Sequence, residues 1–423
     1  MFSKFKSYWA KIGPGVVTGA ADDDPSGIAT YSQTGAQYGL SFLWTAIFTL
    51  PFMVTVQEMC ARLGIVTGKG LANNIRTHCP SYILYISTIC LIIANTFNIG
   101  ADISAIGEAV QLLFPTLSIV YIVIIFTLFS LLLQILVPYQ KYARYLKYLS
   151  FTLIAYIIAG LTAGLIWKDL FFAVAIPSFE FNKESALLIC AILGTTISPY
   201  LFFWQTSQEV EEKIARRKGI KFVGSEISEN DSNRAISGMR FDVWTGMFFS
   251  NLTMFFIIAL CGTVLFPNGV RDIETAAQAA QALLPFAGNA TYILFTLGIV
   301  GTGLLAVPIL AGSSAYAIAE TFRFKEGLYH KYREAKAFYG IIVFSMLIGL
   351  GITFIGIPPM KALIYSAILN GIMAPFLLMV IVYLSSKESI MGKWKNTKSQ
   401  SFLGWTITGI MTMASVTAVW FLI

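Results

Sequence analysis

Asp22-Asp23-Asp24-Pro25-Ser26-Gly27 interrupts an apolar run that extends from residue 12 to residue 38. Proline removes a backbone donor and glycine loosens a helix, so the helix should unwind here at membrane depth. A second stretch, Gly194-Thr195-Thr196-Ile197-Ser198-Pro199, interrupts the run from 185 to 208 in the same way. An aspartate at the bilayer centre costs roughly 2.5–3.5 kcal/mol on insertion scales unless it faces water, a cation or a proton. Three adjacent aspartates at a helix break therefore predict a functional site.

The rest of the chain has the composition of an α-helical membrane protein. Hydrophobic residues make up 56% of the 423 residues and charged residues only 12%, with a mean hydropathy of +0.71. A soluble domain carries about 25% charged residues, so a water-soluble protein is excluded. The apolar runs are continuous rather than alternating, which excludes a β-barrel. They predict about eleven transmembrane helices, near 12–38, 40–61, 81–113, 117–137, 146–166, 185–208, 241–266, 290–322, 337–356, 359–385 and 402–422.

The basic residues predict the orientation. Of the 29 Lys and Arg, all but Lys168, Lys183, Arg271 and Lys361 fall on one side of the predicted membrane. The positive-inside rule then places the N-terminus in the cytoplasm and the C-terminus outside, in a multi-pass protein of the plasma membrane. The net charge of +7 is explained by this topology and does not indicate nucleic-acid binding.

The two interrupted spans are the first and the sixth, which suggests an internal repeat. Within one integral domain (1–423), spans 1–5 (1–166) and spans 6–10 (185–385) would have opposite orientations, and span 11 (402–422) would follow. Matched broken helices in an inverted repeat indicate the midplane binding site of a transporter. The outer segment 267–289, Ala-rich after an acidic start, predicts a short surface helix.

The sequence of the first break resembles the NRAMP family of divalent-metal transporters. Gly13-Pro14-Gly15 followed by Asp24-Pro25-Ser26-Gly27-Ile28-Ala29-Thr30 is similar to that family's first-span pattern, and the resemblance covers essentially the whole chain. The family signature is Asp-Pro-Gly-Asn, in which Asp and Asn both bind metal. The resemblance implies a leucine-transporter-like fold with five plus five inverted helices, and it implies that Asp24 binds the ion.

Several positions depart from the family pattern. Gly27 replaces the metal-binding Asn, Ile197-Ser198-Pro199 replaces Met-Pro-His, and Trp204 replaces a second His. These departures resemble the NRAMP-related magnesium transporters, which carry Mg²⁺ and Mn²⁺.

Ligand chemistry favours the same ions. A Met thioether favours transition metals, whereas Ile197 offers no ligand atom, and both histidines (His78 and His330) fall in predicted loops. The remaining ligands near the breaks are oxygens, from Asp24, the Ala21 carbonyl, Thr195 and Thr196. Mg²⁺ binds through one or two carboxylates and keeps several waters, and Gly27 would widen the site for a partly hydrated ion.

Further polar residues predict an ion path. Asn95, Asn98 and Asp102 share one face of span 3, where they either line the path or make interhelical hydrogen bonds. Asp102 matches an acid of the NRAMP proton route, but Ala105 replaces the second acid. The other candidates are Asp23, Asn370 in span 10, and Glu58, which either lines the cytoplasmic exit or snorkels to the interface.

We therefore expect a secondary transporter that imports Mg²⁺ and Mn²⁺ by alternating access, with weak or no proton coupling. Two alternatives keep the fold: a proton-coupled Mn²⁺/Fe²⁺ symporter, or a carrier of amino acids or other organic solutes. An enzyme is disfavoured, because the spans contain no His-Glu-x-x-His pattern and no Ser–His pairing. The expected partners are the metal ion and the lipid bilayer, with no cofactor and no obligate protein partner.

Overall fold

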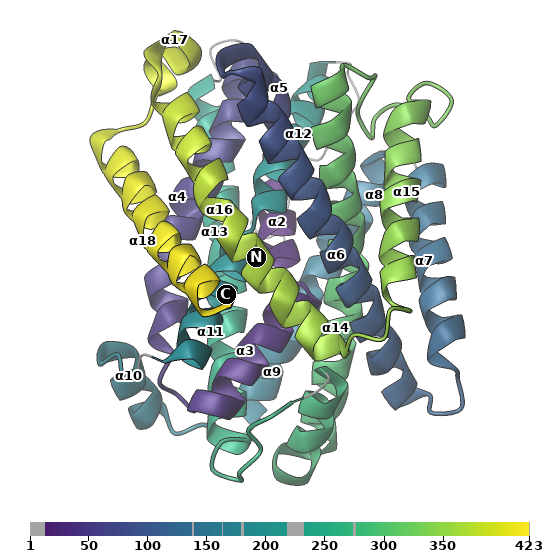
Figure 1. Ribbon diagram of the computed structural model, residues 1–423, viewed down its shortest axis with the longest axis vertical. Coiled ribbons are helices and arrows are strands. Elements are labelled where there is room, and N and C mark those ends of the chain that lie inside the picture. Colours follow the sequence, from purple (N-terminus) through teal and green to yellow (C-terminus); the bar gives the residue numbers. More distant parts are fainter. Residues whose placement is uncertain are drawn as a thin grey trace, which may run out of the picture.

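The chain folds into a bundle of helices, and the computed structural model describes residues 13–137, 139–162, 164–178, 182–217, 232–273 and 276–422 (Figure 1). Eight segments are long and apolar enough to cross a membrane: Ser81–Leu113, Ile119–Leu136, Lys141–Thr162, Lys183–Ile214, Ala235–Val264, Tyr292–Phe322, Pro359–Ser386 and Lys398–Leu422. The other predicted spans correspond to the pair α2–α3, to α4 and to the shorter apolar helix α15. The prediction of an all-α membrane protein is confirmed.

The first half of the bundle consists of α2 (Pro14–Asp22), α3 (Pro25–Tyr38), α4 (Trp44–Thr67), α5 (Leu71–His78), α6 (Ser81–Leu113), α7 (Ile119–Leu136), α8 (Tyr139–Leu149), α9 (Leu153–Thr162) and α10 (Trp167–Ala175). The second half consists of α11 (Lys183–Thr196), α12 (Pro199–Arg217), α13 (Ser232–Val264), α14 (Ala276–Phe322), α15 (Lys336–Ile352), α16 (Pro359–Ser386), α17 (Glu388–Met391) and α18 (Lys398–Leu422). Helices α5 and α17 lie at one end of the bundle and α10 at the other (Figure 1).

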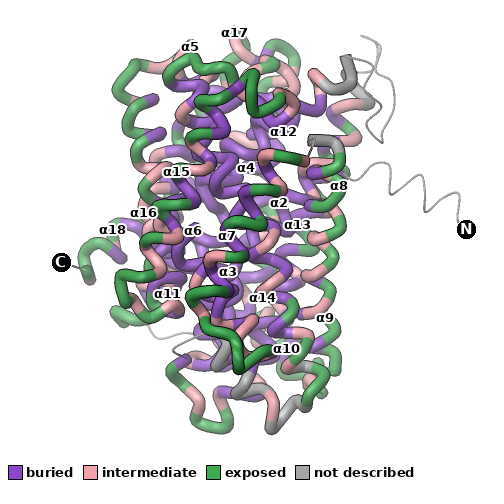
Figure 2. The backbone as a smooth tube through the Cα atoms, turned by 90° about the vertical axis from the view of Figure 1, so that its right-hand side faces the viewer, coloured by how far each residue is buried: buried purple, intermediate pink, exposed green. Residues whose placement is uncertain are grey.

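Both predicted helix breaks are present at the predicted positions. Helix α2 ends at Asp22 and α3 begins at Pro25, while α11 ends at Thr196 and α12 begins at Pro199. The broken helices lie inside the bundle, where the backbone is mostly buried, whereas exposed residues follow its outer helices (Figure 2). Large apolar side chains on the outside, such as Leu136, Phe171 and Trp420, are exposed, as lipid-facing residues are in a membrane protein.

Small residues let the first broken span pack closely against α13. A Cβ atom on Gly19 would lie 2.3 Å from the backbone of Gly246, and one on Gly15 would lie 2.7 Å from the backbone nitrogen of Val243. The second broken span packs in the same way against α16, since a Cβ atom on Gly194 would lie 2.1 Å from the carbonyl oxygen of Ala367. Small residues allow helix backbones to approach this closely in membrane proteins.

The segment before span 8 differs from the prediction. Helix α14 runs without interruption for 47 residues, so the Ala-rich part of 267–289 continues directly into the membrane span and does not form a separate short helix. Propensity predicted the helical content of this segment, but the prediction of a separate short helix was wrong. Residues 274 and 275, at the acidic start of the segment, lie outside the described part of the chain.

Candidate metal site

The carboxylate of Asp24 lies at the first break and caps the start of α3. Its Oδ1 accepts hydrogen bonds from the Gly27 backbone N–H at 2.9 Å and from the Ser26 hydroxyl at 2.5 Å. Its Oδ2 accepts a hydrogen bond from the Asn98 amide of α6 at 2.8 Å. The helix N-terminus and these donors together stabilise a negative charge in this buried position.

Asn98 connects this carboxylate to a third helix. Its amide oxygen accepts a hydrogen bond from the Ser366 hydroxyl of α16 at 2.6 Å. All three side chains are buried. The chain from Asp24 through Asn98 to Ser366 therefore joins spans 1, 3 and 10 at the first break.

The proline at each break leaves one carbonyl oxygen without its usual helical donor. In an α-helix a carbonyl accepts from the N–H four residues later, and that residue is Pro25 for Ala21 and Pro199 for Thr195. Hydroxyl groups fill both positions. The Tyr200 hydroxyl donates to the Ala21 carbonyl at 2.6 Å, and the Ser198 hydroxyl donates to the Thr195 carbonyl at 2.7 Å.

The two breaks meet at Gly27 and Thr195. A Cβ atom on Gly27 would lie 3.0 Å from Thr195 Oγ1 and 3.3 Å from the carbonyl oxygen of Asp22. The space beside Gly27 is thus occupied by Thr195 in this conformation, rather than being open as expected. Thr195 Oγ1 is buried and has no hydrogen-bond partner among the described residues.

The neighbouring residues of the second break make contacts within α11 or with α14. The Thr196 hydroxyl donates to the Ile192 carbonyl of its own helix at 2.7 Å, so it is not brought to Asp24. The Ile197 backbone N–H ends α11 by donating to the Leu193 carbonyl at 2.9 Å, and its side chain is buried. Trp204, seven residues after Ile197, packs against Gly312 of α14.

The other acids near the breaks have fewer partners. Asp22 accepts one hydrogen bond, from the Ser250 hydroxyl at 3.2 Å. Within the described ranges, neither oxygen of Asp23 and neither oxygen of Asp102 has a hydrogen-bond partner, although both residues are fully buried. A buried carboxylate without a partner is costly, so these positions suit a bound cation or a proton.

Two further predicted path residues, Asn95 and Asn370, differ in their hydrogen bonds. Asn95 donates to Ser314 Oγ at 3.0 Å and to the Leu310 carbonyl at 3.1 Å, which is the interhelical alternative. Asn370 is buried on α16, and its Oδ1 has no partner in the described part of the chain.

Glu58 belongs to an ion-pair network and not to an open path. It lies 2.8 Å from Arg240 Nε and 3.3 Å from Arg62 Nη1, and it accepts a hydrogen bond from Gln400 at 2.9 Å. This network joins α4, α13 and α18. The predicted alternatives, a lining role or simple snorkelling, did not include these partners.

Two functional contacts were not predicted, namely those of Tyr200 and Ser366. Tyr200 directly follows Pro199, so a hydroxyl at the break could have been suspected from its position. The contact of Ser366 could not be predicted in this way, because a serine hydroxyl in a membrane helix usually donates a hydrogen bond to a backbone carbonyl of the same helix.

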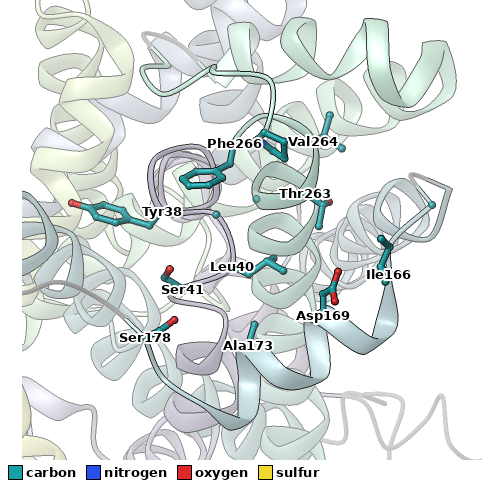
Figure 3. A pocket seen from close by; sticks show the side chains of 14 residues that line it. Tyr38, Leu40, Ser41, Ile166, Asp169, Ala173, Ser178, Thr263, Val264 and Phe266 are labelled. Atoms are coloured by element: carbon teal, nitrogen blue, oxygen red, sulfur yellow. The ribbon is translucent and has the colours of Figure 1, made fainter.

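A separate cavity of about 520 Å³ lies at the end of the bundle that carries α10. Its lining includes Tyr38, Ser41, Asp169 and Phe266, whose side chains surround the loop after α3 (Figure 3). Asp24 and Asp102 are not part of this lining and are fully enclosed by the bundle. The structure therefore holds the two breaks in a closed state.

Comparison with known proteins identifies the family. The model of the family described as natural resistance-associated macrophage protein-like (Nramp) matches residues 15–421. The chain is 25% identical over 404 residues to the divalent metal cation transporter MntH of Klebsiella pneumoniae, covering 95% of this chain and 92% of the relative.

Solved structures share the fold. A manganese transporter from Eremococcus coleocola, in complex with an aromatic bis-isothiourea substituted compound, superposes with a TM-score of 0.74 at 18% identity, over 99% of this chain and 88% of that one. Mhp1, a transporter of the nucleobase-cation-symport-1 family, has a TM-score of 0.58 at 14% identity, over 97% and 92% of the two chains. The prediction of a leucine-transporter-like fold is thereby confirmed. The family match and the MntH relative confirm the expectation of a transporter rather than an enzyme. With its family model matched over nearly the whole length, the chain belongs to the Nramp family of divalent-metal transporters.

Proposed function

We propose that this protein imports Mg²⁺ and Mn²⁺ through a midplane site at the breaks of α2–α3 and α11–α12. The observation that carries the proposal is an oxygen-only set of groups at the point where the two breaks meet. It combines the Asp24 carboxylate, the Ala21 carbonyl freed by Pro25, and the Thr195 hydroxyl beside Gly27. The printed names of the relatives, a divalent metal cation transporter and a manganese transporter, support a divalent cation as the substrate.

The selectivity proposed here follows from the absence of soft ligands at this point. Ile197 stands at the end of α11 and offers only hydrocarbon, and both histidines of the chain lie outside the broken helices. Carboxylate, carbonyl and water oxygens suit Mg²⁺ and Mn²⁺, whereas thioether and imidazole favour softer metals. An amino-acid carrier would instead use the break to bind a carboxylate, and Asp24 would repel it.

The transport cycle would exchange hydrogen bonds for metal–oxygen bonds. In the closed state the donors of Ser26, Gly27 and Asn98 stabilise the Asp24 carboxylate by hydrogen bonds. An arriving cation would compete with these donors for the carboxylate oxygens. Since Asn98 is also bonded to Ser366, loss of its bond to Asp24 would break the hydrogen-bonded link between span 1 and spans 3 and 10. The half-helices α2 and α12 could then move while the site itself stays in place.

The orientation proposed here places the end with α5 and α17 in the cytoplasm. Among the described residues, that end carries the connections in which most of the Lys and Arg residues fall. Import would then follow both the concentration gradient and a cytoplasm-negative membrane potential.

Uptake by proteoliposomes tests the proposal. Purified protein should load Mg²⁺ into vesicles that contain a Mg²⁺-sensitive dye, and external Mg²⁺ should compete with Mn²⁺ uptake. A protein that moves Cd²⁺ well but ignores millimolar Mg²⁺ would contradict it, and transport of an amino acid instead of a metal would favour the alternative carrier.

A further inference from the structure

We propose that Tyr200 is a specificity-determining residue of this site. Its hydroxyl would accept a hydrogen bond from a water molecule retained by the transported ion, and would thereby favour Mg²⁺ over Mn²⁺. The inference rests on the proposed function, in which Ala21 and Asp24 bind the ion.

Tyr200 is held firmly at the meeting point of the two broken spans. Its side chain is fully buried, and its hydroxyl donates to the Ala21 carbonyl at 2.6 Å. Its own backbone carbonyl accepts a hydrogen bond from the Ser313 hydroxyl of α14 at 2.8 Å. Because Pro199 begins α12, the ring projects from the first turn of that helix toward α2.

The hydrogen-bonding capacity of these two groups decides what the phenol can bind. A carbonyl oxygen has two lone pairs, so Ala21 can accept from Tyr200 and still bind a cation. A phenol has one O–H donor, and in Tyr200 that donor is used on Ala21. Toward the site, the phenolic oxygen is therefore an acceptor, which attracts the hydrogen atoms of a metal-bound water.

The distances permit one intervening water. An ion about 2.1 Å from the Ala21 oxygen, on its second lone pair, would lie about 4 Å from the phenolic oxygen, and at most about 4.7 Å from it. A direct metal bond of about 2.1 Å is too short for that separation, but a water bound to the ion can span it with a hydrogen bond of about 2.8 Å. Mg²⁺ dehydrates reluctantly and keeps several waters in protein sites, so an acceptor for its water benefits Mg²⁺ most.

The test compares Tyr200→Phe with wild type for both ions in proteoliposomes. We expect the KM for Mg²⁺ to rise roughly tenfold, the factor that one hydrogen bond supports, while the KM for Mn²⁺ rises less than about threefold. The maximal rate should change little for either ion. Tyr339→Phe is the matched control, because it also removes a tyrosine–carbonyl hydrogen bond, of 2.7 Å to His330, but far from the breaks. It should leave both KM values unchanged.

Tyr200→Leu removes the same hydroxyl and should give the same Mg²⁺-specific rise, which covers the case in which the phenylalanine variant does not fold. Equal rises for the two ions would mean that Tyr200 only holds the Ala21 carbonyl in place, and would overturn the inference. An unchanged KM for Mg²⁺ would overturn it as well. Wild-type protein that transports neither ion would refute the proposed function itself, and this inference with it.

Discussion

At the scale of single residues, Asp24 combines two tasks, since the carboxylate proposed to bind the ion also caps α3. Asp24→Ala should abolish uptake, and loss of the cap should lower the free energy of unfolding by about 1 kcal/mol. Asp24→Asn separates the tasks, because Asn is an equally good cap but carries no charge. It should retain stability and still lose transport, as measured by thermal unfolding in detergent and by liposome uptake.

The controls for Asp24 are its neighbours. Asp22→Asn and Asp23→Asn should retain part of the uptake, because neither side chain is bonded to Asn98 or to the start of α3 as Asp24 is. Near-normal uptake by Asp24→Asn would show that the charge at this position is dispensable and would contradict the site assignment.

Ile197 and Gly27 make the selectivity testable. Ile197→Met should shift preference toward Mn²⁺ and Cd²⁺, because a thioether binds soft metals. Gly27→Asn alone should reduce transport of all ions, since its Cβ would lie 3.0 Å from Thr195 Oγ1. Adding Thr195→Ala should relieve this contact and restore uptake with a Mn²⁺ preference, because the amide oxygen introduced at position 27 would replace the lost Thr195 hydroxyl. Competition between Mg²⁺, Mn²⁺ and Cd²⁺ measures the shift. A variant that combines Ile197→Met, Gly27→Asn and Thr195→Ala and still prefers Mg²⁺ would count against the argument from ligand softness.

The sequence could predict backbone ligands better than side-chain partners. A proline removes the donor for the carbonyl four residues before it, so Pro25 and Pro199 indicate Ala21 and Thr195 directly. The partners of these groups depend on helices that are far away in sequence. Ser366 is 268 residues from Asn98, and no local pattern reports that contact. The same holds for Glu58, whose partners Arg240 and Gln400 come from α13 and α18.

At the scale of elements, the close packing of α2 against α13 should limit which residues the first span tolerates. Gly19→Ala would place a methyl group 2.3 Å from the backbone of Gly246, so the helices would have to separate. Overpacking of this kind costs about 1–3 kcal/mol. The variant should melt at a lower temperature in detergent and transport more slowly. Gly409→Ala on α18 is the control, because nothing lies within 4 Å of its added methyl group; equal melting of the two variants would refute the packing argument.

A second element, the connection between α14 and α15, should make stability depend on pH. Burial and the negative charges of Glu320 and Glu211 raise the pKa of Glu326 to about 9, from an ordinary value of 4.5, against a smaller opposite effect of Arg76. The folded protein therefore binds this proton more tightly than the unfolded chain does. The stabilisation is fully present below about pH 4.5, declines as the pH rises, and is lost above about pH 9.

Glu326→Gln should remove this contribution to the pH dependence and raise the melting temperature at pH 8 to 9. The measurement is thermal unfolding in detergent between pH 5 and pH 9 for both proteins. Glu334→Gln is the control, because its side chain is exposed beside His330 and its pKa is lowered instead of raised. A Glu326 variant whose melting profile parallels that of wild type would show that the carboxyl is not buried with its proton.

The presence of the helices was easier to predict than where one helix ends and the next begins. Apolar run length and proline position predicted both broken spans within a few residues, because these features act locally. The long helix α14 was wrongly divided because an alanine-rich, acidic start is typical of a surface helix. Only packing against the neighbouring helices distinguishes an extended membrane helix from a separate one.

At the scale of the whole molecule, transport can be driven by the membrane potential or by coupling to protons. A cytoplasm-negative potential of ~100 mV gives a divalent cation about 4.6 kcal/mol across the full field, which is enough for more than a thousandfold accumulation. Proton coupling would need a relay across the bundle. Asp102 is buried without a hydrogen-bond partner in the described residues, and Ala105 follows it on the same helix. Pro199 stands where the family pattern that this sequence resembles has a histidine.

We therefore expect uptake to be driven by concentration and potential, with little proton movement. A pH-sensitive dye inside proteoliposomes should report no acidification while Mg²⁺ or Mn²⁺ enters, and an imposed inside-negative potential should accelerate entry. Asp102→Asn should then transport at a rate close to that of wild type, since the residue would not carry protons. Acidification that follows metal entry and disappears in Asp102→Asn would show the opposite: one buried carboxylate with bound water would then be a sufficient relay, and the protein would be a proton symporter despite its missing second acid and histidine.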